Sequence, residues 1–173
     1  MQKLARASLT GDADATPLKT LKYIDLLLSF CASLNTLRGG DRRLPGKDDL
    51  RAKLGGVPEF LVESIKKQFV DGKNIVTRFK YDLLLSTLCA LTLHVDGFET
   101  DTWDLKEDLR LENSELAVYF KELGCKVSNV TLADQKKFGL QGMPVAVLKT
   151  RRKAVLTVPL SLPVVRSRMV KRK

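Results

Sequence analysis

Lysine and arginine side chains are the residues of this chain whose types and spacing best suit a chemical task, the neutralisation of phosphate groups. One group lies at the end of a predicted helix and in the turn and strand after it, and another lies at a predicted β-turn. The groups are Lys66, Lys67, Lys73, Arg78 and Lys80, and Lys149, Arg151, Arg152 and Lys153. Few Asn, Gln or Arg residues accompany them on the predicted helices, so we expect nucleic-acid binding through phosphates without strong sequence specificity. The plainer alternative is that both groups are solvated surface charge.

The charge of the chain is distributed unevenly. The formal net charge is +10 over 173 residues, and residues 149–173 contain nine basic residues and no acidic one. Residues 96–115 have the opposite character, with eight acidic residues against two basic ones. We expect the basic and the acidic surface to serve different partners, or one of them to serve none. The basic tail 161–173 is consistent with a nuclear or nucleolar localisation signal, with a segment that binds DNA nonspecifically, or with a terminus without a role. Its composition does not distinguish among these.

Catalytic, metal-binding and cofactor chemistry is not indicated. His94 is the one histidine and forms no recognisable arrangement with Ser or Cys, and there is no glycine-rich phosphate loop. Cys31, Cys89 and Cys125 occur singly at apolar positions, which predicts reduced core residues rather than a disulfide framework or a zinc site. The carboxylates of residues 96–115 lack ligand spacing. We therefore expect a non-catalytic protein with no metal, no cofactor and no membrane partner, because no apolar run reaches the length of a membrane span.

Hydrophobic periodicity and turn residues predict three helices and a strand in the first half of the chain. Thr16 is expected to cap the first helix, and Gly39-Gly40 is expected to close it near Arg38. The remaining predicted elements are a short helix from Asp48 or Asp49 to Leu54, a helix from Pro58 to Phe69, a turn over Asp71–Asn74 and a strand over Ile75–Phe79.

The same order of elements recurs in the second half. The predicted elements there are a long helix over Tyr81–Val95, a short helix from Thr102 to Leu109, a helix capped by Asn113 and stopped by Gly124, and strands over Cys125–Thr131, Val145–Thr150 and Ala154–Val158, with Arg151–Lys153 as a basic turn between the last two. Three helices and a hairpin in each half predict a tandem winged helix, mainly α with small β wings (α+β). The expected boundaries are a flexible segment 1–16, a first winged helix 17–80, a second 81–160 and the tail 161–173, with Thr77–Lys80 at the junction.

Several stretches carry a resemblance to a known family. They are LKYIDLLLSF (21–30), IKKQF (65–69), TRFKYDLLLSTLCALTLHVDGF (77–98), YFKELGCKV (119–127) and AVLTVPLSLP (154–163). Their order and spacing resemble the C-terminal part of the forty-nine-kilodalton subunit specific to RNA polymerase I, which is related to TFIIE and TFIIF. The resemblance implies a tandem winged helix on a nuclear and nucleolar polymerase. It also implies an N-terminal dimerisation module, absent from this chain, that binds a smaller polymerase subunit.

Two functions follow from these observations. The first is a DNA-binding accessory domain that supports initiation and elongation of ribosomal RNA synthesis. Its expected partners are other RNA polymerase I subunits and DNA, double-stranded, with single strands left open. The alternative is a winged-helix adaptor that binds protein and no nucleic acid, for which the acidic residues 96–115 would supply the surface.

Overall fold

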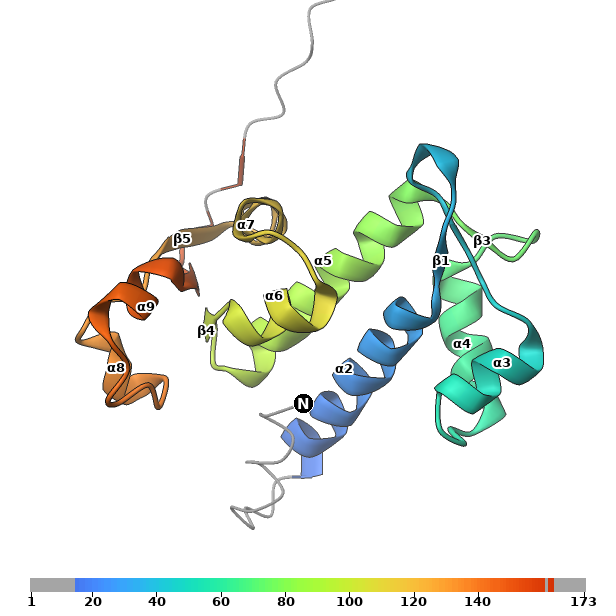
Figure 1. Ribbon diagram of the computed structural model, residues 1–173, viewed down its shortest axis with the longest axis horizontal. Helices are drawn as coiled ribbons and strands as arrows, with labels where there is room; N and C mark the ends of the chain where they lie inside the picture. The colour runs from blue at the N-terminus through green and yellow to red at the C-terminus, as the bar shows by residue number, and fades with distance from the viewer. Residues whose placement is uncertain (1–14, 161, 164–173) are drawn as a thin grey trace, which may run out of the picture.

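The computed structural model describes residues 15–160, 162 and 163, so the segment 1–14 and most of the predicted tail 161–173 lie outside the described residues. Within the described residues, the first half forms four α-helices, three short strands and one 3-10 helix (Figure 1). In chain order these are α2 (Ala15–Ser33), β1 (Asn35–Thr36), η1 (Arg38–Gly40), β2 (Arg42–Arg43), α3 (Lys47–Lys53), α4 (Glu59–Phe69), β3 (Ile75–Val76) and α5 (Arg78–Val95). The second half continues with β4 (Glu99–Asp101), α6 (Trp103–Leu109), α7 (Asn113–Glu122), β5 (Cys125–Asn129), α8 (Asp134–Lys137), α9 (Val145–Thr150) and β6 (Arg152–Leu156).

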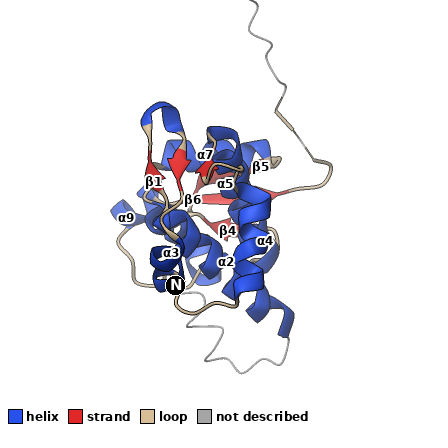
Figure 2. Ribbon diagram, turned by 90° about the vertical axis from the view of Figure 1, so that its right-hand side faces the viewer, coloured by secondary structure: helices blue, strands red, loops and turns tan. Residues whose placement is uncertain are grey.

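The strands form two small antiparallel sheets, seen as short segments among helices in Figure 2. The first sheet has the order β1-β2-β3, and the second has the order β4-β6-β5. β6 therefore lies in the centre of its sheet, where Ala154 pairs with Thr100 of β4 and with Val127 of β5. The architecture is α+β, as predicted.

The hydrophobic core consists of two large clusters that meet along α5. One cluster joins α2, α3, α4 and the N-terminal half of α5, with Phe30 and Phe69 fully buried. The other joins the C-terminal half of α5 to α6, α7 and the second sheet, with Phe120 fully buried. The three cysteines are free and buried, as predicted, and burial raises the pKa of the Cys89 thiol to about 12.

The glycine pair Gly39-Gly40 reverses the chain, but it does not end the first helix. α2 ends at Ser33, five residues before the predicted end at Arg38, and the glycines form the tip of a hairpin between β1 and β2. Their φ values of 89° and 92° lie in the left-handed region, which residues without a Cβ adopt at no steric cost. The prediction of left-handed φ values at this pair is confirmed, and the prediction that the pair closes the first helix is wrong.

The predicted strand Ile75–Phe79 is also shorter than expected. Thr77 caps α5 by accepting a hydrogen bond from the Lys80 backbone N–H, so the helix begins at Arg78. The prediction of Arg78 and Lys80 on a wing is therefore wrong, and both lie in the first turn of α5. The predicted end of this helix at Val95 is confirmed.

The predicted strand Val145–Thr150 is the helix α9, which starts after Pro144. Its valines favour a strand, but Leu148 is buried with Val130 and Leu140 in a third, small cluster, and this packing outweighs the local preference. As a result the predicted basic turn does not exist. Arg151 follows α9 directly, and Arg152 and Lys153 begin β6.

The start of α7 differs from the prediction by one residue. Glu112, rather than Asn113, is the N-cap, in a capping box with Glu115. The Asn113 side chain instead donates to the Thr150 carbonyl oxygen at 3.0 Å, which ties the start of α7 to the end of α9.

Candidate nucleic-acid interface

The first predicted basic group lies where the end of α4 meets the start of α5. Lys66 and Lys67 are in the last turn of α4, and Lys73 is in the turn that leads to β3. Lys80 closes the junction, because its Nζ donates to the Gln68 carbonyl oxygen at 2.9 Å. The fold therefore brings these residues to one end of the first half of the protein, and Lys67 and Lys73 are exposed there.

Arg78 connects this end to the β1–β2 hairpin. Its backbone N–H donates to Asp41 Oδ1 at 2.9 Å. Its side chain lies against Gly40, where an added Cβ would come within 3.5 Å of Arg78 Cδ. The hairpin tip is thus fixed beside the first turn of α5, as Figure 1 shows at the upper end of the molecule.

The hairpin adds three arginines that the sequence reasoning missed: Arg38, Arg42 and Arg43. The signal was present, because a Gly-Gly pair is one of the residue pairs typical of a β-hairpin turn. Arg42 has a structural role, since its guanidinium lies 3.7 Å from the centre of the Tyr81 ring and donates to Thr36 Oγ1 at 3.1 Å. Arg38 and Arg43 are exposed.

Lys66 is more restricted than its neighbour Lys67. Its Nζ forms an ion pair with Glu63 Oε1 at 2.8 Å along the exposed side of α4. The pair is solvent-accessible and therefore weak, but it offsets one positive charge of the predicted group. The exposed cations that remain at this end are Arg38, Arg43, Lys67, Lys73 and Arg78.

The second predicted basic group is divided by the fold. Lys149 and Arg152 are exposed, and Arg152 contacts the side-chain oxygen of Asn129. Arg151 is only 8% exposed; it forms an ion pair with Asp101 of β4 and stacks 5.0 Å from the centre of the Trp103 ring. The Arg151 side chain therefore stabilises the protein interior and does not lie at an exposed turn.

Lys153 is likewise engaged within the protein. Its Nζ lies 2.7 Å from Asp134 Oδ1 and 3.7 Å from Glu99 Oε1. Burial would raise the pKa of Asp134, but hydrogen bonds from Lys153 and Thr131 outweigh it and lower the pKa to about 2. Asp134 therefore keeps its charge at neutral pH and fastens α8 to the second sheet.

Figure 1 places the two groups apart, with α9 at one end of the longest axis and the turn before β3 at the other. The first group, enlarged by the hairpin, retains five exposed cations, whereas the second retains Lys149 and Arg152. No helix in the described ranges 15–160 and 162–163 is long and apolar enough to cross a membrane.

The fold and this surface define an α+β protein with a basic end suited to an anionic partner. A family model described as "A49-like RNA polymerase I associated factor" matches residues 1–163, and the chain belongs to that family. It is 28% identical over 166 residues to the DNA-directed RNA polymerase I subunit rpa49 of Schizosaccharomyces pombe, covering 94% of this chain and 37% of that subunit. It is 28% identical over 167 residues to the subunit RPA49 of Saccharomyces cerevisiae, covering 90% of this chain and 38% of that subunit. The chain thus spans well under half the length of these relatives.

Proposed function

We propose that this chain is a DNA-holding part of an RNA polymerase I subunit, acting in the nucleolus during initiation and elongation of ribosomal RNA synthesis. The observation that carries the proposal is the basic end formed by the β1–β2 hairpin, the last turn of α4 and the first turn of α5. Membership of the family supports a role at RNA polymerase I. The two yeast relatives are named as subunits of that polymerase, which supports its other subunits as partners of this chain. The role is non-catalytic.

We further propose that the halves 17–80 and 81–160 are two winged-helix modules. The second half supports this reading with the order α5, β4, α6, α7, β5 and β6, in which the last strand pairs between the other two. Its wing is the connection between β5 and β6, which contains α8 and α9. In the first half α2, α3 and α4 are the three helices, and the chain enters α5 directly after β3.

The proposed contact residues are those whose charge faces solvent. Arg43, Lys67 and Lys73 form no ion pair with another described residue, so their ammonium and guanidinium groups are ready to replace counterions on a phosphate backbone. Arg78, Lys66 and Lys80 border this surface. In the second half, Lys149 and Arg152 form a smaller additional contact, whereas the internal pairs of Arg151 and Lys153 argue against a role at DNA.

Attachment to the polymerase makes a weak contact sufficient. A site held near its DNA acts at a high effective concentration, so a few phosphate contacts hold the duplex without strong intrinsic affinity. We place the heterodimer module, which would bind the smaller polymerase subunit, in a part of the subunit that this chain does not include. The chain's limited coverage of its relatives supports that placement.

The test is binding of the 173-residue chain to unrelated double-stranded and single-stranded oligonucleotides over a salt titration. We expect salt-sensitive binding that does not depend on sequence. Replacing Arg43, Lys67 and Lys73 by Gln removes three phosphate contacts and reduces the magnitude of the slope of log K against log salt by as much as about 2.7 on double strands.

The matched control replaces Lys22, Lys121 and Lys136 by Gln, which removes the same charge from exposed positions on α2, α7 and α8. Equal loss in both triple variants would show that net charge, and not this surface, determines affinity. No binding even at low salt would remove the DNA role and leave the adaptor function.

A further inference from the structure

A groove with an apolar floor lies at the other end of α5, where α2, α5, α6 and the segment after α8 converge. Its cavity volume is ≈ 430 Å³, and an adjoining recess adds ≈ 50 Å³. The groove and the recess share Leu21, Val95, Asp96 and Asp104, so they form one continuous surface. The size lies within the range of roughly 300–1,000 Å³ that is usual for ligand sites.

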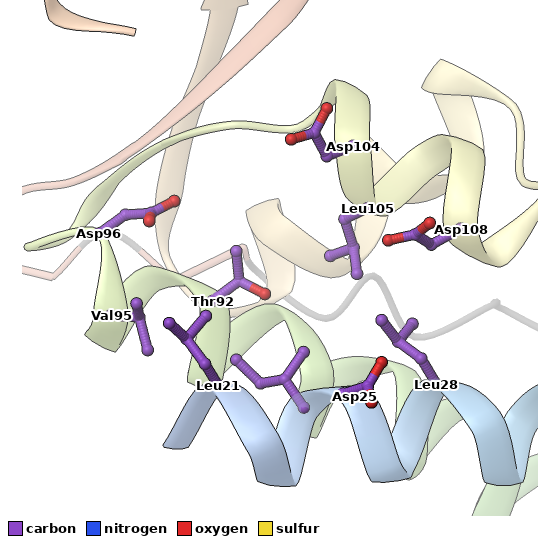
Figure 3. Close-up of a pocket in the computed structure, with 10 residues that line it drawn as sticks. Leu21, Asp25, Leu28, Thr92, Val95, Asp96, Asp104, Leu105 and Asp108 are labelled. Atoms are coloured by element: carbon purple, nitrogen blue, oxygen red, sulfur yellow. The ribbon is translucent and has the colours of Figure 1, made fainter. Parts of the chain in front are cut away.

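The floor is made of aliphatic, aromatic and thioether groups from four parts of the chain. Figure 3 shows Leu21 and Leu28 of α2 opposite Leu105 of α6, with Val95 at the end of α5 beside them. Phe138 and Met143 extend the floor beyond the recess and are half-buried. These groups would bury further apolar area if another chain covered them.

The rim of this apolar groove is acidic. Six carboxylates and two cations line the groove and recess: Asp25, Asp96, Glu99, Asp101, Asp104 and Asp108, and Lys137 and Arg151. Both cations already pair with carboxylates of the lining, Lys137 with Glu99 and Arg151 with Asp101. Asp25 and Asp104 form no ion pair with another described residue, so they favour a positively charged occupant over a nucleic-acid backbone.

The positive charge of the occupant must be spread out rather than concentrated. Among the described residues, no group of three or more His, Cys, Asp or Glu side chains is close enough to hold a metal ion. In Figure 3 the carboxylates of Asp25, Asp96, Asp104 and Asp108 lie around the apolar side chains instead of converging on one point. Several separate cations on an apolar scaffold match this arrangement.

We propose that this groove binds a segment of a partner protein in which lysines or arginines alternate with large apolar side chains. The apolar side chains lie on the floor, and the cations reach the acidic rim. The site is distinct from the proposed DNA surface, because Arg78 begins α5 at the basic end and Val95 ends it at the groove. Both surfaces can be occupied at once, so this inference goes beyond the proposed function and does not depend on it.

The test uses the 173-residue chain and a fluorescent model peptide built only from leucine and lysine. Methyl NMR signals of Leu28, Val95 and Leu105 are expected to shift on addition of the peptide, while those of Leu44 and Leu54 in the first half stay in place. A peptide of lysine alone and one of leucine and glutamate are expected to bind at least tenfold more weakly. Added double-stranded DNA is expected not to displace the peptide, so failure of DNA binding and failure of the groove are separate outcomes.

Variants of the acidic rim then test which carboxylates bind the cations of the peptide. Replacing Asp25 and Asp104 by Asn is expected to weaken peptide binding at low salt by about two- to five-fold per carboxylate. The matched control replaces Asp48 by Asn and Glu122 by Gln, two exposed acidic residues outside the groove, and is expected to leave binding unchanged. Equal binding of the lysine peptide, or shifts confined to other methyl groups, would overturn the proposal. Binding that appears only after residues 1–14 are removed would also overturn it and assign the groove to that segment of the chain.

Discussion

Replacing Arg151 by methionine separates a structural role from a role at DNA. The guanidinium pairs with Asp101 of β4, and it stacks on the Trp103 ring. Both side chains of the ion pair are about nine-tenths buried. Methionine has a similar length and no charge, so it preserves much of the packing and leaves the Asp101 carboxylate without its cation.

The expected cost follows from the burial of the pair. Removing one partner of a buried ion pair costs about 3–5 kcal/mol, because the other charge remains in a poorly solvated site. Asp101 keeps one donor, the Trp103 backbone N–H at 3.0 Å, which favours the lower end of that range. We therefore expect a loss of about 3 kcal/mol in the free energy of unfolding. With a urea dependence of about 2 kcal/mol per molar, the midpoint falls by about 1.5 M.

The measurement is urea unfolding at pH 7 for the parent chain, Arg151→Met, and Arg152→Gln as the neighbouring control. Arg152 is the next residue along the chain, at the start of β6, and is exposed, so its replacement is expected to change the free energy of unfolding by less than about 0.5 kcal/mol. Replacing Asp101 by Leu in addition to Arg151→Met should recover part of the loss, since no uncompensated charge remains. A loss below about 1 kcal/mol for Arg151→Met would refute the reasoning, because that is the magnitude of an exposed ion pair.

Three further predictions concern acid stability, core packing and thiol reactivity. The pKa of Asp134 lies at about 2, below its ordinary value of 3.8. The charged carboxylate therefore stabilises the fold by about 2 kcal/mol above pH 4, and this stabilisation is lost as the pH falls through 2. Urea unfolding at several pH values should show the loss, and Asp134→Asn should abolish this pH dependence. Phe120→Ala should lower the free energy of unfolding by about 3–5 kcal/mol in thermal melts because Phe120 is fully buried, whereas Phe60→Ala, at a side chain that is 71% exposed, should change it little. Cys89, with a pKa raised by burial to about 12, should react with a thiol reagent at pH 8 only after unfolding, and rapid labelling of the folded chain would contradict its burial.

The sequence predicted the long, strongly periodic elements well. The helices from Pro58 to Phe69 and up to Val95 were found, because their apolar side chains recur at helical spacing and their ends have clear signals. The buried cysteines were also predicted, from their positions on apolar faces. These features depend on local pattern, which is readable without knowledge of the fold.

The features that failed depend on contacts between distant residues. Val145–Thr150 has the composition of a strand, and it is a helix because Leu148 packs against residues that lie 8 and 18 positions earlier. Whether Lys153 faces solvent or a carboxylate depends on Asp134 and Glu99, which approach it only in the folded chain. Charge alone therefore identified a basic segment but could not separate the cations that face solvent from those paired inside.

The continuity of α5 sets the geometry between the two proposed surfaces. Its 18 residues span about 27 Å, from the arginine beside the hairpin to the valine in the groove. Because an α-helix of this length is rigid, DNA at one end and a protein segment at the other are held at one separation and one relative rotation. An insertion of a single residue into α5 would turn one surface by about 100° relative to the other, so the length of this helix sets their alignment as well as their distance.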